Sequence, residues 1–398
     1  MSAERSVQRW LLGLFVVGLA FSITLSESVL FLLGLLWLWR FRDASARTAL
    51  VFPLAGPVLA LVGTTLLSAA RSANPPASLV DAKGLLLLSI LYVLVEALPD
   101  VDAADRFLTG LFLLVTAHAG LSVIQVALCP REPVSLPLLA RFFHRCDRAH
   151  GFFSIYMTLA GVLNLMLLAT LPRLFGRERR RWMLPAWVLS ALGLALTLTR
   201  GAWLGFLAGA TALSVVLRWF WVLGAIGGVL LAALLLLPAG SLEHRLRSLG
   251  DPKDPTARQR LYMWHSGLAI VRDHPLTGMG PGQVKAVFPR YAQPEAHRKT
   301  TSHVHSAPLQ IAAERGLLGL AAWLWLWITF FVQSMRLLRR LGSAEGLASR
   351  LVAGSLAAVF GFLVAGLFEY NFGDSEVVMV AYAVMVLPFV VERSLARR

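Results

Sequence analysis

The sequence predicts an all-α, polytopic integral membrane protein with about 12 transmembrane helices and a long outer loop that contains short helices. Of its 398 residues, 57% are hydrophobic and only 15% are charged, and the mean hydropathy is +0.68. A soluble domain carries about 25% charged residues. The apolar segments are long and leucine-rich, without the alternation of a membrane barrel, so the spans are helices. This composition excludes a soluble enzyme, a disordered chain and a disulfide-built secreted module.

A helix needs about 20 apolar residues to cross the hydrocarbon. The second predicted span is short, and the eighth and ninth abut at Arg218. The twelve predicted spans are Trp10–Leu25, Val29–Trp39, Leu50–Ala70, Leu79–Leu98, Phe107–Leu128, Gly151–Leu171, Trp182–Thr199, Ala202–Leu217, Trp219–Leu237, Gly316–Leu337, Leu351–Phe368 and Val377–Val391. We therefore expect helices 1–9 in residues 1–239, an outer loop carrying the functional motifs in residues 240–315, and helices 10–12 in residues 316–398.

The orientation follows from arginine clusters in short loops, which stay in the cytoplasm. With the N-terminus inside, these clusters and the C-terminus all fall inside. The inward residues are Arg5, Arg9, Arg40, Arg42, Arg47, Arg173, Arg177, Arg179, Arg180, Arg181, Arg336, Arg339, Arg340, Arg350, Arg393, Arg397 and Arg398.

Most polar chemistry lies in the long outer loop. Between Ser241 and Arg315, eleven lysines and arginines stand against six acidic residues. An anionic ligand at the outer surface would explain this excess; alternatively, long loops escape the charge rule. We expect helices at 256–270 and 283–291 in this loop. A glycine-rich turn over 278–282 could cradle phosphate through its N–H groups, or simply reverse the chain.

Two cysteines, Cys129 and Cys146, fall in the first long outer loop. An oxidising compartment would permit a disulfide there. Spacing alone leaves open whether the two residues are bonded.

Three outer features carry candidate chemistry. Arg200 stands between two spans with no loop, where its planar fork suits a diphosphate; the alternative is a snorkelling arginine. Arg260 and Trp264 share one helix face, and Arg258 precedes them; an ordinary solvated basic helix is the alternative here.

His303 and His305 precede a helix that enters the membrane. Either histidine could act as a general base, because imidazole exchanges protons near working pH; a structural role applies equally to both. A metal pair is also conceivable, but the sequence offers no convincing third and fourth ligand, and we expect no metal.

In this order, the motifs resemble those of bacterial O-antigen ligases, within the O-antigen ligase/polymerase membrane superfamily. His305-Ser306, nine residues and Gly316-Leu-Leu-Gly319 match the pattern His-[Asn/Ser/Gln]-x9-Gly-x-x-Gly. Thr199-Arg200-Gly-Ala-Trp-Leu204 is similar to the superfamily's Ser-Arg-x-x-x-Leu segment, with Thr in place of Ser. Arg260-x-x-x-Trp264, followed by 274–282, resembles its outer-loop signature.

The resemblance implies transfer of a glycan from undecaprenyl diphosphate to a sugar hydroxyl of lipid A–core oligosaccharide. It places this inverting reaction at the periplasmic face of the bacterial inner membrane, without ATP, metal or another cofactor, and without nucleic acid. His305 would take the proton of the acceptor hydroxyl. Arg200 and Arg260 would neutralise the departing diphosphate, with Arg258 as a second contact.

Weaker candidates at the outer face rest on charge alone. Lys83 could contact the diphosphate. Asp374 could contact a sugar or an arginine, and Arg148 could contact the phosphates of the acceptor core. Glu369 belongs to the same acidic turn as Asp374. Within the superfamily, an O-antigen polymerase and a protein O-oligosaccharyltransferase remain alternatives. A lipid-linked oligosaccharide transporter is the alternative from a different class, although it should carry intramembrane charges and an internal repeat.

Overall fold

The computed structural model describes residues 2–39, 42, 52–130, 135, 142–144, 146–176, 180–225, 227, 255–342 and 346–397. These residues hold fourteen α-helices, three short 3-10 helices and no β-strand. The α-helices are α1 (Ser2–Phe21), α2 (Ile23–Trp39), α4 (Ala55–Ala70), α5 (Pro75–Asp81), α6 (Ile90–Ala97), α7 (Val101–Ala127), α9 (Tyr156–Thr170), α10 (Met183–Leu196), α11 (Arg200–Leu217), α14 (Pro255–Asp273), α15 (Val284–Tyr291), α16 (Ala307–Leu341), α17 (Leu347–Gly366) and α18 (Ser375–Ala396). The 3-10 helices are η2 (Ala82–Ser89), η3 (Leu171–Phe175) and η5 (Asn371–Gly373).

The all-helical, polytopic fold class is confirmed. Within the described residues, seven helical segments are long and apolar enough to cross a membrane, and four shorter apolar helices accompany them. These eleven match eleven of the twelve predicted spans. The remaining one, Trp219–Leu237, lies largely outside the described residues. Large apolar side chains such as Trp10, Leu59 and Leu86 are exposed on the bundle surface, as a lipid-facing surface requires.

The first predicted boundary was wrong by several residues. The chain bends at Ser22, so α1 ends at Phe21 and α2 begins at Ile23, where the apolar pattern predicted one span to Leu25. The bend depends on a glycine: a Cβ at Gly18 would lie 2.7 Å from the backbone nitrogen of Ser26. Hydropathy does not register such a close approach of backbones, because both flanking segments are apolar.

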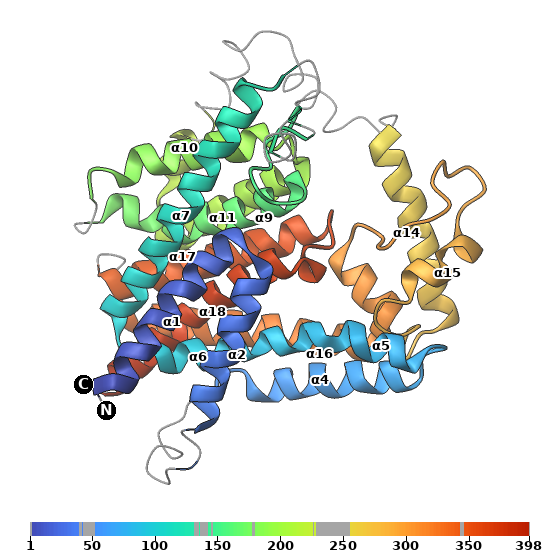
Figure 1. Ribbon diagram of the computed structural model, residues 1–398, viewed down its shortest axis with the longest axis horizontal. Helices are drawn as coiled ribbons and strands as arrows, with labels where there is room; N and C mark the ends of the chain where they lie inside the picture. Colours follow the sequence, from blue (N-terminus) through green and yellow to red (C-terminus); the bar gives the residue numbers. More distant parts are fainter. Residues whose placement is uncertain are drawn as a thin grey trace.

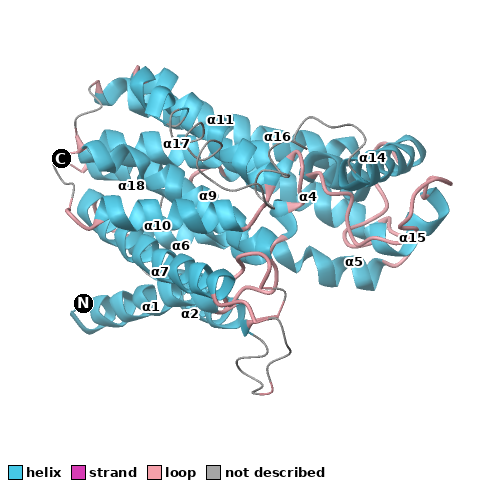
Figure 2. Ribbon diagram, turned by 90° about the horizontal axis from the view of Figure 1, so that it is seen from above, coloured by secondary structure: helices cyan, strands magenta, loops and turns pink. Residues whose placement is uncertain are grey.

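Ion pairs tie several helix ends together at one end of the bundle. Arg173 lies 2.6 Å from Asp105, and Arg393 lies 3.2 Å from Glu96. Part of the arginine excess is therefore buried and structural. Both chain termini lie at the same end of the molecule, and α14 and α15 lie at the opposite end (Figures 1 and 2).

Close helix packing brings the N-terminal end of α11 beside the C-terminal end of α17. A Cβ at Gly205 of α11 would lie 2.5 Å from the carbonyl oxygen of Gly361 in α17. Small residues let backbones approach in this way within a membrane. The N-terminus of α11, which begins at Arg200, therefore lies beside the turn that follows α17.

The longest helix, α16, is interrupted at its entry into the bundle. Gly316 has φ 68° and ψ −174°, which is not helical. The freed N–H groups of Leu317 and Leu318 are satisfied by the carbonyls of Pro275 (2.7 Å) and Leu276 (3.4 Å). A Cβ at Gly316 would lie 2.1 Å from the Leu276 oxygen. The segment after α14 thus inserts its backbone into the break, which only glycine permits.

Candidate active site

Glu369, in the turn between α17 and α18, gathers the candidate catalytic side chains. Both of its carboxylate oxygens lie 2.9 Å from Nδ1 of His305. Nε2 of His303 lies 3.2 Å from Oε1, and the guanidinium of Arg260 lies 3.7 Å from Oε2. Three residues that the sequence singled out therefore converge on one carboxylate.

The backbone around His305 is held in an uncommon conformation. His305 has φ 50°, in the left-handed region that residues other than glycine rarely adopt. Its carbonyl accepts a hydrogen bond of 3.4 Å from Nε1 of Trp264. The next residue, Ser306, is the N-cap of α16. Such strain clusters at functional sites, where the surroundings hold it in place.

The electrostatics of the cluster favour an ionised Glu369. Burial by itself raises the pKa of this carboxyl, but hydrogen bonds from His303 and His305 outweigh burial and hold the pKa well below its usual range. A carboxylate that accepts from Nδ1–H fixes the tautomer of His305 with Nε2 unprotonated. Among the described residues, no protein group hydrogen-bonds Nε2, so this nitrogen is available to a substrate.

The start of α11, where Arg200 stands, packs against the turn that carries Glu369. A Cβ at Gly201 would lie 3.1 Å from the Cβ of Phe368, the residue before Glu369. On the other side, the ring of Phe368 lies 6.4 Å from the ring of Trp264. The start of α11 and the middle of α14 therefore flank the same turn.

The glycine-rich turn does not present a phosphate cradle. The N–H groups of Met279 and Gly280 donate to the carbonyls of Ala313 (3.0 Å) and Glu314 (2.9 Å). That of Gly282 donates to the Glu314 carboxylate at 3.1 Å. Since protein acceptors occupy these donors, the turn packs against α16 instead of binding an anion.

The other candidates from the sequence are exposed or contact residues outside the Glu369 cluster. Arg258 is exposed and lies 3.5 Å from the hydroxyl of Tyr262. Lys83 is exposed in η2. Asp374 caps α18 and accepts a 2.6 Å hydrogen bond from Thr158. The guanidinium of Arg148 stacks 4.4 Å from the ring centroid of Tyr156. Among the described residues, none of the four forms a hydrogen bond or an ion pair with His303, His305, Arg260 or Glu369.

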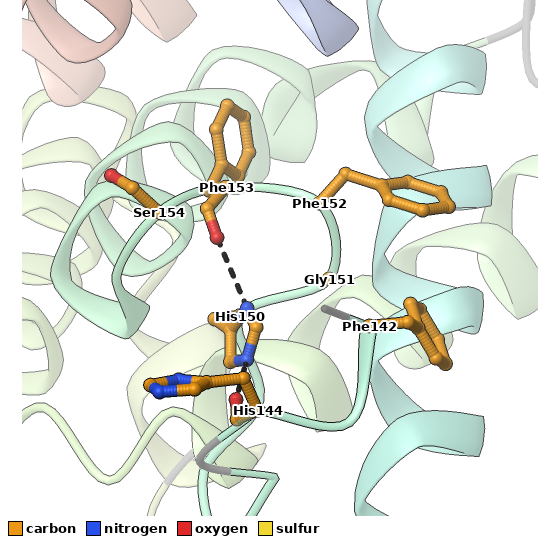
Figure 3. Close-up of a pocket in the computed structure, with 7 residues that line it drawn as sticks. All are labelled: Phe142, His144, His150, Gly151, Phe152, Phe153 and Ser154. Carbon is orange, nitrogen blue, oxygen red and sulfur yellow. Dashed lines mark hydrogen bonds between the residues drawn. The ribbon is translucent and has the colours of Figure 1, made fainter. Parts of the chain in front are cut away.

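A separate cavity of about 190 Å³ lies beside the first long loop (Figure 3). Its lining residues are Phe142, His144, His150, Gly151, Phe152, Phe153 and Ser154. The ring nitrogens of His150 face backbone carbonyls, Nδ1 at 3.0 Å from Phe153 and Nε2 at 2.6 Å from His144. These contacts occupy the imidazole, so it does not serve as a base.

The cysteines, which the sequence left open, form a disulfide. Cys129 and Cys146 are bonded with a Cα–Cα distance of 5.4 Å. The bond closes the loop that supplies part of the Figure 3 cavity.

The cluster also has the composition of a metal site. His303, His305 and Glu369 each offer one ligand atom, and these atoms lie within 4.8 Å of one another. The sequence offered no convincing third ligand, and the fold supplies one in Glu369. The positive charge of the nearby Arg260 guanidinium would repel a divalent cation bound at this carboxylate.

Glu369 is the residue whose importance sequence reasoning underrated. The sequence indicated only an acidic turn after the eleventh span, with a sugar or an arginine as its partner. The arginine contact is present, and the two histidine contacts are new. Glu369 lies 64 positions from His305, so no local spacing rule connects them.

The fold and the site define a multi-pass helical membrane protein with a histidine–carboxylate–arginine cluster at one end of its bundle. Residues 185–324 match the family model described as O-antigen ligase, so this part of the chain is similar to that family. Members of this family are transferases of lipid-linked sugars. The matched region includes Arg200, Arg260 and His305 but ends before Glu369. Comparison with curated proteins gives no match.

Proposed function

We propose that this protein is an O-antigen ligase that moves a glycan from undecaprenyl diphosphate onto a sugar hydroxyl of lipid A–core oligosaccharide. The observation that carries the proposal is the contact of His305 Nδ1 with Glu369 at 2.9 Å, beside Arg260. A histidine oriented by a carboxylate can act as a general base, and a neighbouring arginine can stabilise an anionic leaving group. Both properties suit glycan transfer from a lipid diphosphate.

In this mechanism, Nε2 of His305 takes the proton of the acceptor hydroxyl as the hydroxyl oxygen attacks the anomeric carbon. The bond from that carbon to the diphosphate oxygen breaks on the opposite face, and inversion follows. Glu369 stays ionised and stabilises the imidazolium that forms, as carboxylates do in other catalytic groupings. Arg200 and Arg260 neutralise the negative charge that grows on the diphosphate, and Arg258 and Lys83 are outer contacts of the same lipid headgroup. His303 supports Glu369.

The energy for the reaction is stored in the donor, so neither nucleotide nor metal is needed. Arginines supply the positive charge that a metal ion would otherwise bring to the leaving group. We expect transfer to continue in EDTA. Loss of transfer in EDTA that zinc restores would instead assign His303, His305 and Glu369 to a catalytic metal.

The protein acts as a multi-pass protein of the bacterial inner membrane, with its basic end and both termini in the cytoplasm. The end with α14 and α15 then faces the periplasm, where the disulfide Cys129–Cys146 is stable. This orientation rests on the arginine clusters and on the placement of the termini opposite α14.

The decisive experiment uses purified protein with undecaprenyl-diphosphate-linked glycan and rough lipopolysaccharide, without nucleotide. A ligase gives glycan joined to the lipid A–core, and the His305→Ala variant gives none. Longer lipid-linked glycan would indicate a polymerase, and glycan on an added acceptor protein would indicate an oligosaccharyltransferase. Movement of the intact donor across a vesicle without any new bond would indicate a transporter.

A further inference from the structure

Three buried polar side chains of α16 lie beneath the candidate active site. Gln310 is 0% exposed, Glu314 4% and Arg315 8%. All three fall at unspecified positions of the matched sequence motif, and the mechanism above does not use them. Charged groups are costly to bury unless they are paired, so their arrangement calls for a reason.

The three side chains form a continuous hydrogen-bonded chain. Nε2 of Gln310 donates to Oε1 of Glu314 at 2.7 Å, and the guanidinium of Arg315 donates to Oε2 at 3.0 Å. The phenol of Tyr370 is an electrostatic partner of the same guanidinium. Glutamine, carboxylate and guanidinium are thus hydrogen-bonded in series, and the phenol of Tyr370 interacts with the guanidinium at the end of this series.

The two ends of this series of side chains lie beside the two residues of the proposed catalytic pair, His305 and Glu369. Oε1 of Gln310 accepts a 2.9 Å hydrogen bond from the backbone N–H of Val304, which precedes His305. At the other end, Tyr370 follows Glu369 directly. The network therefore connects the His305 segment to the Glu369 turn by a route that is separate from their direct 2.9 Å contact.

A third branch fixes the network to neighbouring elements. The carbonyl of Glu314 accepts from Ser68 of α4 at 2.7 Å and from Gly280 at 2.9 Å. Buried ion pairs contribute little net stability compared with apolar packing, and in some proteins they instead specify one arrangement. This network is suited to specifying one arrangement, because it joins four separate segments of the polypeptide.

We propose that Gln310, Glu314, Arg315 and Tyr370 form a positioning network that sets the geometry between His305 and Glu369. The inference rests on the proposed function. In this proposal the four residues act through His305 and Glu369 and do not bind the substrate, and among the described residues none of them hydrogen-bonds Arg260. Breaking the network should therefore lower kcat for glycan transfer and leave KM for the lipid-linked donor unchanged.

Two variants test the network from opposite ends. Tyr370→Phe removes one oxygen atom, and Gln310→Leu removes both amide contacts at similar volume. A misplacement of about 1 Å can lower a rate by about 10²-fold. We expect kcat to fall by roughly 10-fold to 10²-fold in each variant. The double variant should lose about as much as the worse single variant, because residues of one network are not additive.

The control is Ser355→Ala, which removes a buried 2.7 Å hydrogen bond to Val384 between α17 and α18. It should keep kcat at the wild-type level. Wild-type kcat in Tyr370→Phe and Gln310→Leu would overturn the network, as would an equal loss in Ser355→Ala or a loss confined to the donor KM. If Gln310→Leu does not accumulate in the membrane, Tyr370→Phe alone decides.

His305→Ala in the same series separates this proposal from the function it rests on. An inactive His305→Ala beside fully active network variants leaves the ligase proposal standing and removes only the network. Normal transfer by His305→Ala removes the proposed mechanism and the network with it.

Discussion

Glu369 holds two imidazoles and one guanidinium at the turn between α17 and α18. A largely buried carboxylate needs partners, and His303, His305 and Arg260 supply them. Burial raises the pKa of Glu369, but the contacts with His303 and His305 outweigh burial and hold this pKa well below its usual range. A group with a depressed pKa stabilises the fold above its unfolded pKa of about 4.5 and loses this contribution as pH falls. The cluster should thus stay intact at neutral pH and weaken only in acid.

The variant Glu369→Gln tests the role of the charge. The amide keeps the shape of the carboxylate but cannot stabilise an imidazolium, so we expect kcat to fall by about 10²-fold or more. Steady-state transfer assays give kcat and KM. Glu295→Gln, at an exposed position of the outer loop, is the matched control and should behave as wild type. Unchanged transfer by Glu369→Gln would contradict the pairing with His305.

The variant Arg200→Lys tests the clamp on the diphosphate. Lysine keeps the charge but not the planar fork, so we expect transfer to fall by about 10²-fold. Arg272→Lys changes an exposed arginine at the end of α14 and should have no effect. Near-normal rates with purified Arg200→Lys would show that no bidentate contact is made there.

At the scale of elements, the break in α16 explains why the motif contains glycines. Gly316 adopts a positive φ and leaves room for the backbone of Leu276. A Cβ at Gly319 would lie 2.3 Å from the Cβ of Arg315, so the second glycine lets the network arginine lie along its own helix. The motif therefore covers the His305 segment and the interrupted part of α16, the helix that connects this segment to the bundle.

The variant Gly316→Ala tests the break. Alanine would strain the backbone by about 1–3 kcal/mol and clash with the Leu276 carbonyl, so we expect lower thermal stability in detergent and strongly reduced transfer. Gly346→Ala adds a methyl group where nothing lies within 4 Å, and it should leave both quantities unchanged. Wild-type melting of Gly316→Ala would mean that the α16 backbone can straighten.

At the scale of the whole molecule, the bundle separates its two ends by function. Arg173–Asp105 and Arg393–Glu96 join helix ends where the chain begins and finishes. The Glu369 cluster and the disulfide join segments at outer positions of the predicted topology.

Cysteine labelling tests this orientation. Single cysteines at Glu295→Cys and Arg397→Cys occupy exposed positions near opposite ends, and Cys129 and Cys146 are already bonded. A membrane-impermeant maleimide should label Glu295→Cys in spheroplasts, and Arg397→Cys only after lysis. The reverse pattern would contradict a periplasmic active site.

The sequence by itself determined the membrane-spanning, all-helical fold, since spans of hydrocarbon length are a local property of composition. It also determined the loop helices α14 and α15, because helical patterning and a terminating Asp-His-Pro segment are local signals. Arg200, Arg260 and His305 could be chosen as candidate site residues from the sequence for the same reason, because each lies in a short motif whose residues are close in the chain.

Only the tertiary structure decided which of these residues meet. The pairing of His305 with Glu369, the occupied N–H groups of the 278–282 turn and the bonding of Cys129 to Cys146 all depend on how distant segments pack. The N-terminal end of α11 lies beside the C-terminal end of α17 because Gly205 and Gly361 allow the two backbones to approach. Hydropathy and spacing describe each helix separately, whereas such contacts arise only from the shapes of both helices together.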